Sequence, residues 1–167
     1  MFIEARKIIK LPVAADDVIS KVGEVEQIIV DPETGHLVGF LISTGGFFST
    51  KKALSVTDII EWDPNGLITK SIENLVDPSE IIRIKNVVDK GIFLIGMKAQ
   101  TESGKNLGQI DNFLIDTATE QVVKYYLHDL LGNSRIIPAD KVVKIDKVIV
   151  FKEDIDMPQG VAGVQAA

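Results

Sequence analysis

The sequence predicts a mainly β protein built from two small β-barrels joined by a short α-helix. Three observations support this fold class. One pattern of apolar and polar residues occurs twice, at Val22–Ile42 and at Leu107–Leu127, a shift of 85 positions (107 − 22 = 85). Apolar runs of strand length alternate with turn residues along the chain. Aromatic residues make up only 6% of the sequence, so Val, Ile and Leu must build the core, and β-branched residues favour sheets.

The two segments read VGEVEQIIVDPETGHLVGFLI and LGQIDNFLIDTATEQVVKYYL, and they align without a gap. Identical residues stand at Gly23/Gly108, Asp31/Asp116, Thr34/Thr119 and Val38/Val123. Many other positions pair one apolar residue with a different apolar residue. Because the pattern of burial is kept more closely than the residues themselves, we interpret the chain as a tandem duplication of a unit of roughly 65–75 residues.

Each repeat is expected to consist of short strands separated by turns. In the first repeat, at residues 1–72, we place strands near 7–12, 24–31, 36–43, 46–50, 53–56 and 67–70. In the second repeat, at residues 92–154, we place them near 92–99, 109–116, 121–128, 133–137 and 147–151. Antiparallel strands this short leave exposed edges unless the sheet closes on itself, so each repeat is predicted to be a small barrel.

Residues 73–91 are predicted to form a helical linker of about three turns. Asp77 is a good N-cap and Pro78 suits the first helical position, while Gly91 can end the helix. Apolar residues recur at helical spacing, and these are Ile81, Ile82, Ile84 and Val88. Residues 155–167 show no such pattern and are expected to form a flexible tail.

The composition argues against several classes of function. The net charge is −6, and no cluster of basic residues offers the face that direct nucleic-acid binding requires. No stretch approaches the ~20 apolar residues needed to cross a bilayer, so we expect no membrane insertion. The N-terminus lacks the apolar region of a secretory signal, which favours a cytoplasmic location. The chain has no cysteine, which excludes disulfides and thiolate chemistry.

The acidic DPETG segment is better explained as a turn than as a ligand site. A calcium loop starting at Asp31 would need glycine and glutamate where His36 and Ile42 stand. Asp, Pro and Gly in this order are typical of a hairpin turn. Residues interpreted as structural turn positions in the two repeats are Gly23, Asp31, Gly35, Asp58, Gly108, Asp116 and Asp140. For Asp58 and Asp140 we expect carboxylates that accept backbone N–H groups.

No catalytic, metal-binding or cofactor-binding set is identified in the sequence. His36 and His128 are the only histidines, and they occupy positions of the repeat that are not equivalent. We interpret both as solvated residues at strand ends, although convergence of the two with a carboxylate would be compatible with a metal or acid–base site.

Adjacent aromatic residues are the candidate contacts with a partner. Neighbouring positions of a strand point to opposite faces, so only one residue of Phe47 and Phe48 can enter its own core, and the same holds for Tyr125 and Tyr126. Trp62, the single tryptophan, lies at another turn. Burial within the chain is the favoured explanation for each pair, and contact with a partner is the alternative.

The chain resembles the PRC-barrel family. The residues that carry the resemblance are SGKNLGQIDNFLIDTAT (Ser103–Thr119), QVVKYYL and RIIPADKVVKI (Arg135–Ile145), together with the DPETG hairpin and ALSVTDII in the first repeat. The family includes the extramembrane part of the H subunit of the photosynthetic reaction centre and the C-terminal domain of a ribosome-maturation factor. This chain shows no counterpart of the H subunit's membrane anchor. The resemblance implies small barrels that hold other macromolecules, with no shared catalytic residues.

These observations lead to one main hypothesis and two alternatives. The main hypothesis is a non-enzymatic protein-interaction or scaffold module with a protein partner, for which a homo-oligomer is also compatible. The first alternative is a ribosome- or RNA-processing-associated factor. The second is a binder of a small molecule or metal.

Overall fold

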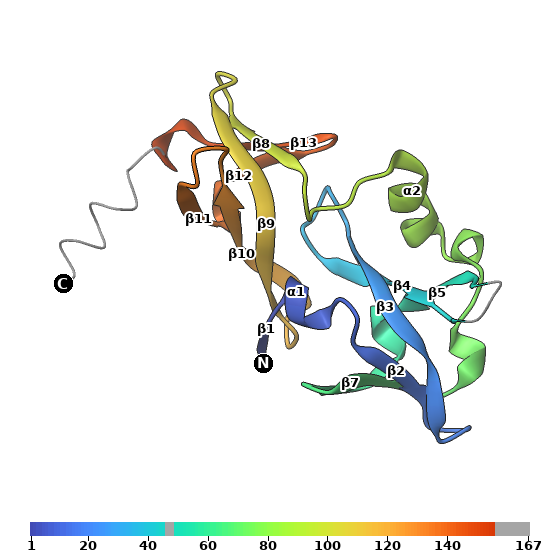
Figure 1. Cartoon of the computed structure of the whole chain (residues 1–167). Coiled ribbons are helices and arrows are strands. Elements are labelled where there is room, and N and C mark those ends of the chain that lie inside the picture. Colours follow the sequence, from blue (N-terminus) through green and yellow to red (C-terminus); the bar gives the residue numbers. More distant parts are fainter. Residues whose placement is uncertain (46–48, 156–167) are drawn as a thin grey trace.

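The computed structural model describes residues 1–45 and 49–155, which form two β-sheets that lie side by side (Figure 1). The first sheet has the strand order β5-β4-β3-β2-β7-β6. Its strands are β2 (Pro12–Ala15), β3 (Ser20–Val30), β4 (Leu37–Ser43), β5 (Lys51–Ser55), β6 (Ile59–Asp63) and β7 (Gly66–Thr69). The second sheet has the corresponding order β11-β10-β9-β8-β13-β12. Its strands are β8 (Lys98–Thr101), β9 (Asn106–Asp116), β10 (Gln121–His128), β11 (Ser134–Pro138), β12 (Val142–Ile145) and β13 (Val148–Phe151).

The identical strand order agrees with the internal duplication seen in the sequence. In each sheet one pair of neighbours is parallel, β2 with β7 and β8 with β13, and the other pairs are antiparallel. Both repeats therefore follow one path through space, although few of their residues are identical.

The prediction that each sheet closes into a barrel is wrong, because the two end strands of each sheet are not hydrogen-bonded to each other. In the first sheet the end strands β5 and β6 do not pair with each other, and in the second sheet β11 and β12 do not. These end strands follow one another in the chain, separated only by the 3-10 turns η1 (Val56–Asp58) and η4 (Ala139–Lys141). The hydrogen-bonded ladder is therefore open at the same point in both sheets.

Two of the expected strands begin later than predicted. The run predicted at 7–12 contains the end of a short helix, α1 (Ala5–Ile8), and then Lys10 with a positive φ of 75°. The run predicted at 92–99 is interrupted in the same way by Gly96, with φ of 84°. A left-handed residue cannot continue an extended strand, so β2 and β8 start only after it. The strand expected at 46–50 falls largely outside the described residues.

Strands β6 and β12 were not predicted because their apolar residues do not alternate. Strand β6 reads IIEWD, and β12 reads VVKI. Each strand begins directly after a 3-10 turn, so in the sequence it merges with the turn before it.

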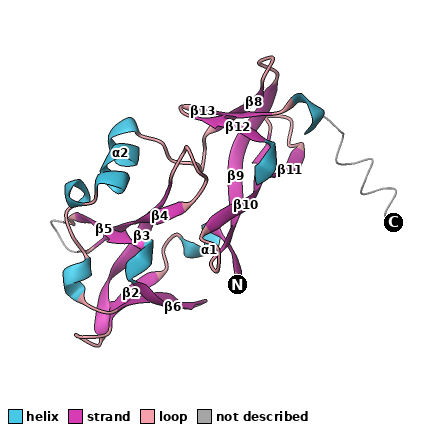
Figure 2. Ribbon diagram, turned by 180° about the vertical axis from the view of Figure 1, so that it is seen from behind, coloured by secondary structure: helices cyan, strands magenta, loops and turns pink. Residues whose placement is uncertain are grey.

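The segment between the sheets contains η3 (Pro78–Glu80) and the nine-residue helix α2 (Ile82–Lys90). Gly91 ends α2 in the left-handed conformation, as the sequence predicts. The Asp77 carboxylate, however, caps η3 rather than α2, since Ile81 is extended and separates the two. Helix α2 lies against the first sheet (Figure 2). Its apolar side is buried there through Ile84 and Val87. The role of this helix as a linker between two units stays a prediction.

The two sheets meet at the hairpin turns that the repeated pattern encodes. The turn after β3 and the turn after β9 lie antiparallel, with an isolated bridge between His36 and Gln121. Leu37 donates its backbone N–H to the carbonyl of Glu120 at 2.7 Å, and Val122 donates to Gly35 at 3.2 Å. These residues are equivalent between the repeats (36 + 85 = 121), so the two bonds are the same contact made twice about a local two-fold axis.

The short elements that precede each sheet in the chain pack on the sheet of the other repeat. The three-residue strand β1 (Phe2–Glu4) pairs antiparallel with Leu114–Asp116 of β9, and α1 also packs on β9 (Figure 1). Helix α2, which precedes the second repeat, packs instead on β3 and β4 of the first. Buried apolar side chains from both sheets and from β1 and α1 form one continuous core.

Two further 3-10 turns complete the described chain, η2 (Ile72–Asn74) and η5 (Glu153–Ile155). Among residues 1–45 and 49–155, no helix has the length and apolar character of a membrane span.

Candidate interaction surface

The aromatic residues singled out in the sequence lie in different environments. Phe47 and Phe48 fall outside the described residues. Trp62 is half-buried and packs edge-on against Phe40, with ring centroids 5.8 Å apart. Tyr125 is only 1% exposed, so its suggested contact with a partner is wrong: its ring fills the core of the second repeat.

Tyr126 occupies the opposite face of β10 from Tyr125, as the alternation of a strand requires. It is half-buried, and the Lys124 Nζ atom lies 5.5 Å from the centroid of its ring. Of the two tyrosines, Tyr126 is therefore the one available to a partner.

Gly23 and Gly108 are strand residues, and their interpretation as turn positions is wrong. Gly23 pairs with Val13 beside a bulge in β3, and Gly108 pairs with Ala99 beside the equivalent bulge in β9. A Cβ atom on Gly23 would lie 2.6 Å from the carbonyl oxygen of Ser43, and one on Gly108 would overlap the carbonyl of His128. Close approach of the neighbouring strand is the reason for glycine at both positions.

Asp31 and Gly35 form the predicted turn. The Asp31 carboxylate accepts the backbone N–H of Glu33 at 2.9 Å, and Gly35 adopts a φ of 72°. Arg83 of α2 lies 3.4 Å from the same carboxylate. Partial burial opposes ionisation of Asp31, but the hydrogen bonds from Glu33, Thr34 and Arg83 outweigh it, so the pKa of Asp31 lies below its usual value. In the second repeat Asp116 likewise accepts the N–H of Ala118.

Asp58 and Asp140 occupy the equivalent 3-10 turns η1 and η4. Within the described part of the chain, neither carboxylate accepts a hydrogen bond, so the expected caps on backbone N–H groups are wrong. The Asp58 carbonyl, by contrast, accepts the Thr69 hydroxyl at 2.8 Å. The recurrence of aspartate at this turn has no explanation in its side-chain contacts.

The two histidines lie far apart. The His36 ring contacts the side chain of Gln121 at 3.0 Å, whereas His128 stands at the opposite end of β10. Seven strand steps separate Gln121 from His128, or roughly 23 Å. His128 Nδ1 lies 3.7 Å from Asp111. The two histidines therefore cannot bind one metal together, and residues 1–45 and 49–155 contain no cluster of three or more acidic or histidine side chains arranged to hold a metal ion.

Two of the three most exposed large apolar side chains of the described chain belong to the loop between β10 and β11, which we call the leucine loop (Asp129–Asn133). Leu130 is fully exposed, Leu131 is 88% exposed, and Ile19 of the first repeat is similarly open. Such exposure of adjacent leucines is costly in water and is typical of interaction surfaces.

The leucine loop is held by a single carboxylate. Asp129 accepts the N–H groups of Leu131 and Asn133 and the Asn133 side-chain amide, each at 2.9 Å. The hydrogen bonds from Asn133, first from its side chain and then from its backbone, place the pKa of Asp129 below its usual value. The loop therefore presents its leucines in a defined conformation, beside a carboxylate that stays charged.

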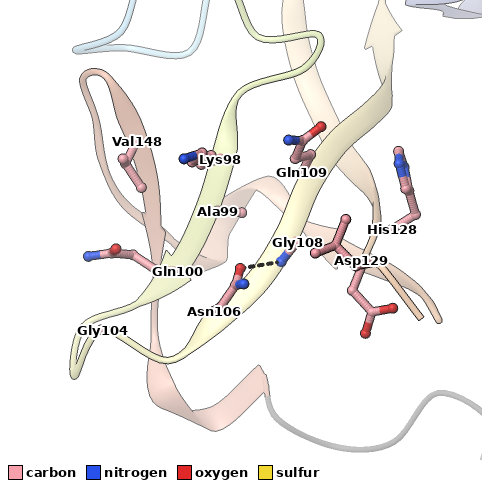
Figure 3. Close-up of a pocket in the computed structure, with 11 residues that line it drawn as sticks. Lys98, Ala99, Gln100, Gly104, Asn106, Gly108, Gln109, His128, Asp129 and Val148 are labelled. Atoms are coloured by element: carbon pink, nitrogen blue, oxygen red, sulfur yellow. Dashed lines mark hydrogen bonds between the residues drawn. The ribbon is translucent and has the colours of Figure 1, made fainter. Parts of the chain in front are cut away.

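A groove of about 340 Å³ lies directly beside this loop, as Figure 3 shows. Its floor consists of small residues, including the buried Ala99 and the bulge residue Gly108. Leu130 also lines the groove. Lys98 and Asp129 lie on opposite sides of it (Figure 3). The Asn106 side chain is turned inward and accepts the Gly108 N–H at 2.9 Å. The remaining polar side chains around the groove are Gln100, Gln109 and His128.

The sequence contains a signal for this surface that aromatic pairs do not reveal. The segment DLLGN combines Asp, Gly and Asn, which form turns, with two consecutive leucines. A turn that carries large apolar residues must expose them unless another element covers them. The groove itself has no such signal, because it depends on how β8, β9 and β10 lie in space.

Comparison with known proteins supports the duplication directly. The model of the PRC-barrel domain matches the chain twice, at residues 1–90 and 94–157. The first match includes α2, in agreement with the packing of that helix on the first sheet. None of the curated proteins matches the chain significantly. The two matches cover nearly all of the sequence, and the chain therefore belongs to the PRC-barrel family as a tandem pair of its domains.

Proposed function

We propose that this protein is a non-enzymatic, cytoplasmic interaction module that binds a protein partner through the leucine loop and groove of the second repeat. The observation that carries the proposal is the full exposure of Leu130 on a loop that Asp129 holds in place. A fixed apolar projection loses little conformational freedom on binding, which favours association. The small residues of the groove floor beside it offer space for side chains of the partner.

A photo-crosslinking residue at position 131 tests this proposal in the native cell. Proteins that crosslink are identified, and each is purified and titrated with the unmodified chain. We expect Leu130→Glu to weaken binding at least tenfold, because it places a charge where an apolar side chain is buried.

The matched control is Ile82→Glu, which makes the same change at a residue of α2 that is 72% exposed. This variant should bind like the original chain. Equal binding by all three proteins would disprove a role for the leucine loop.

A further inference from the structure

We infer that the partner of this surface is a second copy of the same chain. In the inferred dimer, a two-fold axis places the leucine loop of each copy in the groove of the other. The inference rests on the proposed function, because it uses the same surface and names what binds there.

The shape of the surface meets the main requirement of a two-fold interface. In such an interface one patch contacts its own copy, so a patch must be complementary to itself. Here a projection, Leu130 with Leu131, stands next to a hollow floored by Ala99 and Gly108. Turning a second copy over the first brings each projection to the other's hollow and covers both apolar regions at once. A volume of about 340 Å³ is at the lower end of the range for small-molecule sites, and it suits a pair of protruding side chains.

The charged side chains around the groove are also complementary to those of a second copy. The side chain of Lys98 forms no hydrogen bond or ion pair with any residue in the described ranges, and it stands across the groove from Asp129 (Figure 3). When the leucine loop of each copy enters the groove of the other, it carries its own Asp129 to the groove wall that holds Lys98, and the two-fold axis repeats this contact. Two equivalent ion pairs would then flank the apolar contact. A partner with a surface of one sign would satisfy only one of these two residues.

The dimer is expected to be weak. Each copy carries a net charge of −6, so the two copies repel each other over long range. The loop and groove form a small patch, comparable with the smaller transient interfaces. Because added salt screens the net repulsion, moderate ionic strength should favour the dimer over very low salt.

Sedimentation velocity over a range of concentrations is the first test. We expect the full chain to change reversibly from monomer to dimer as its concentration rises. Leu130→Glu should raise the dissociation constant about a hundredfold, since the symmetric contact loses two leucines per dimer. Ile82→Glu, which adds the same charge elsewhere, should leave it nearly unchanged. A chain that stays monomeric at all concentrations, or a dimer that Leu130→Glu leaves intact, would overturn the inference.

Cysteine crosslinking tests the arrangement itself, because the chain has no cysteine of its own. Leu131→Cys and Gln109→Cys proteins are prepared with tags of different mass and then mixed under mild oxidation. Loop-in-groove contact predicts a disulfide between the two different chains, formed faster than any disulfide within either population. Crosslinking only between two Leu131→Cys chains would show a loop-to-loop contact and would contradict the arrangement.

The two proposals can fail separately. If the chain is monomeric but a different purified protein binds through Leu130, the proposed function holds and the second-copy inference is wrong. If the chain is monomeric and Leu130→Glu changes no interaction, both are wrong.

Discussion

Strands β4 and β10 occupy equivalent places in the two sheets, second from the end, but they differ in what covers them. In the first repeat, β4 is buried on both faces from Leu37 to Ile42, because α2 lies over its outer side. In the second repeat, β10 alternates between buried and exposed residues, as expected for a strand with one face in water. The difference shows that one duplicated sheet has diverged in its covering, with a helix over β4 in the first repeat and water on one face of β10 in the second.

One pair of equivalent residues accounts for much of this difference. Gly39 of β4 leaves room for Ile84 of α2, whose Cδ1 atom would lie 2.9 Å from a Cβ at that position. The equivalent residue of β10 is Lys124 (39 + 85 = 124), whose ammonium group lies near the ring of Tyr126. A side chain as large as lysine at position 39 would occupy the space that Ile84 fills.

Exchanging this pair should give the largest effect. Gly39→Lys would bring a side chain against the backbone of Leu54 and a charge under α2, and we expect it to lower the free energy of unfolding by at least ~4 kcal/mol. Chemical denaturation measures the change. The reverse substitution, Lys124→Gly, faces no such contact and should cost no more than ~1 kcal/mol. Similar losses for the two variants would show that α2 does not distinguish the repeats.

The N-terminal strand offers a second way to separate the repeats. Ile3 is buried in β1 against β9, so Ile3→Ala should destabilise the protein by about 2–4 kcal/mol. Hydrogen exchange should show the loss of protection at Leu114–Asp116 of β9, with β3 little affected.

The neighbouring residue in β1 supplies the control for this experiment. Phe2 is 65% exposed, and Phe2→Ala should change stability by less than ~0.5 kcal/mol. If Ile3→Ala removes protection from β3 to the same extent as from β9, strand β1 stabilises both repeats equally.

The two turns at the junction allow a finer comparison. Gly35 and Glu120 are equivalent and both have positive φ, 72° and 56°. Gly35→Ala should cost about 1 kcal/mol, because it places a Cβ in the left-handed region where the present residue has none. Glu120→Ala should change the free energy of unfolding by no more than ~0.5 kcal/mol, since Glu120 already places a Cβ in the left-handed region. Thermal unfolding of both variants tests the difference, and an equal cost would contradict it.

The smallest effect is expected from pH at the Asp31–Arg83 contact. The pKa of Asp31 is lowered in the folded state, so its contribution to stability is complete above about pH 4 and is lost as the pH falls through the lowered value. Asp31→Asn should therefore reduce the dependence of unfolding free energy on pH in the acid range. Urea unfolding at a series of pH values measures this slope. An unchanged slope would mean that the carboxylate contributes equally in the folded and unfolded chain.

The repeated pattern predicted the duplication. Local signals predicted the DPETG turn and the end of α2, because these two depend on residues close in sequence. Gly91 illustrates this, since an apolar helical stripe followed by glycine is a local signal. Three features depend on distant contacts and left no such pattern. Strand β1 has three residues, too few to reveal a partner more than a hundred positions away. Glycine is required at positions 23 and 108 because carbonyl groups of a neighbouring strand lie too close for a Cβ atom. The groove forms only where three strands of the second repeat come together.

The contact between His36 and Gln121 has a consequence for how the protein can change. In a dimer of identical subunits, every substitution appears in both halves, because one gene encodes both. Here the two halves of a near-symmetric pair belong to one polypeptide, so their association is intramolecular and does not weaken on dilution. Each half can then accept substitutions that its mate does not share. Gly39 under a helix in the first repeat and the half-buried Lys124 beside Tyr126 in the second are such a divergence. The covalent chain keeps the two halves together while they diverge.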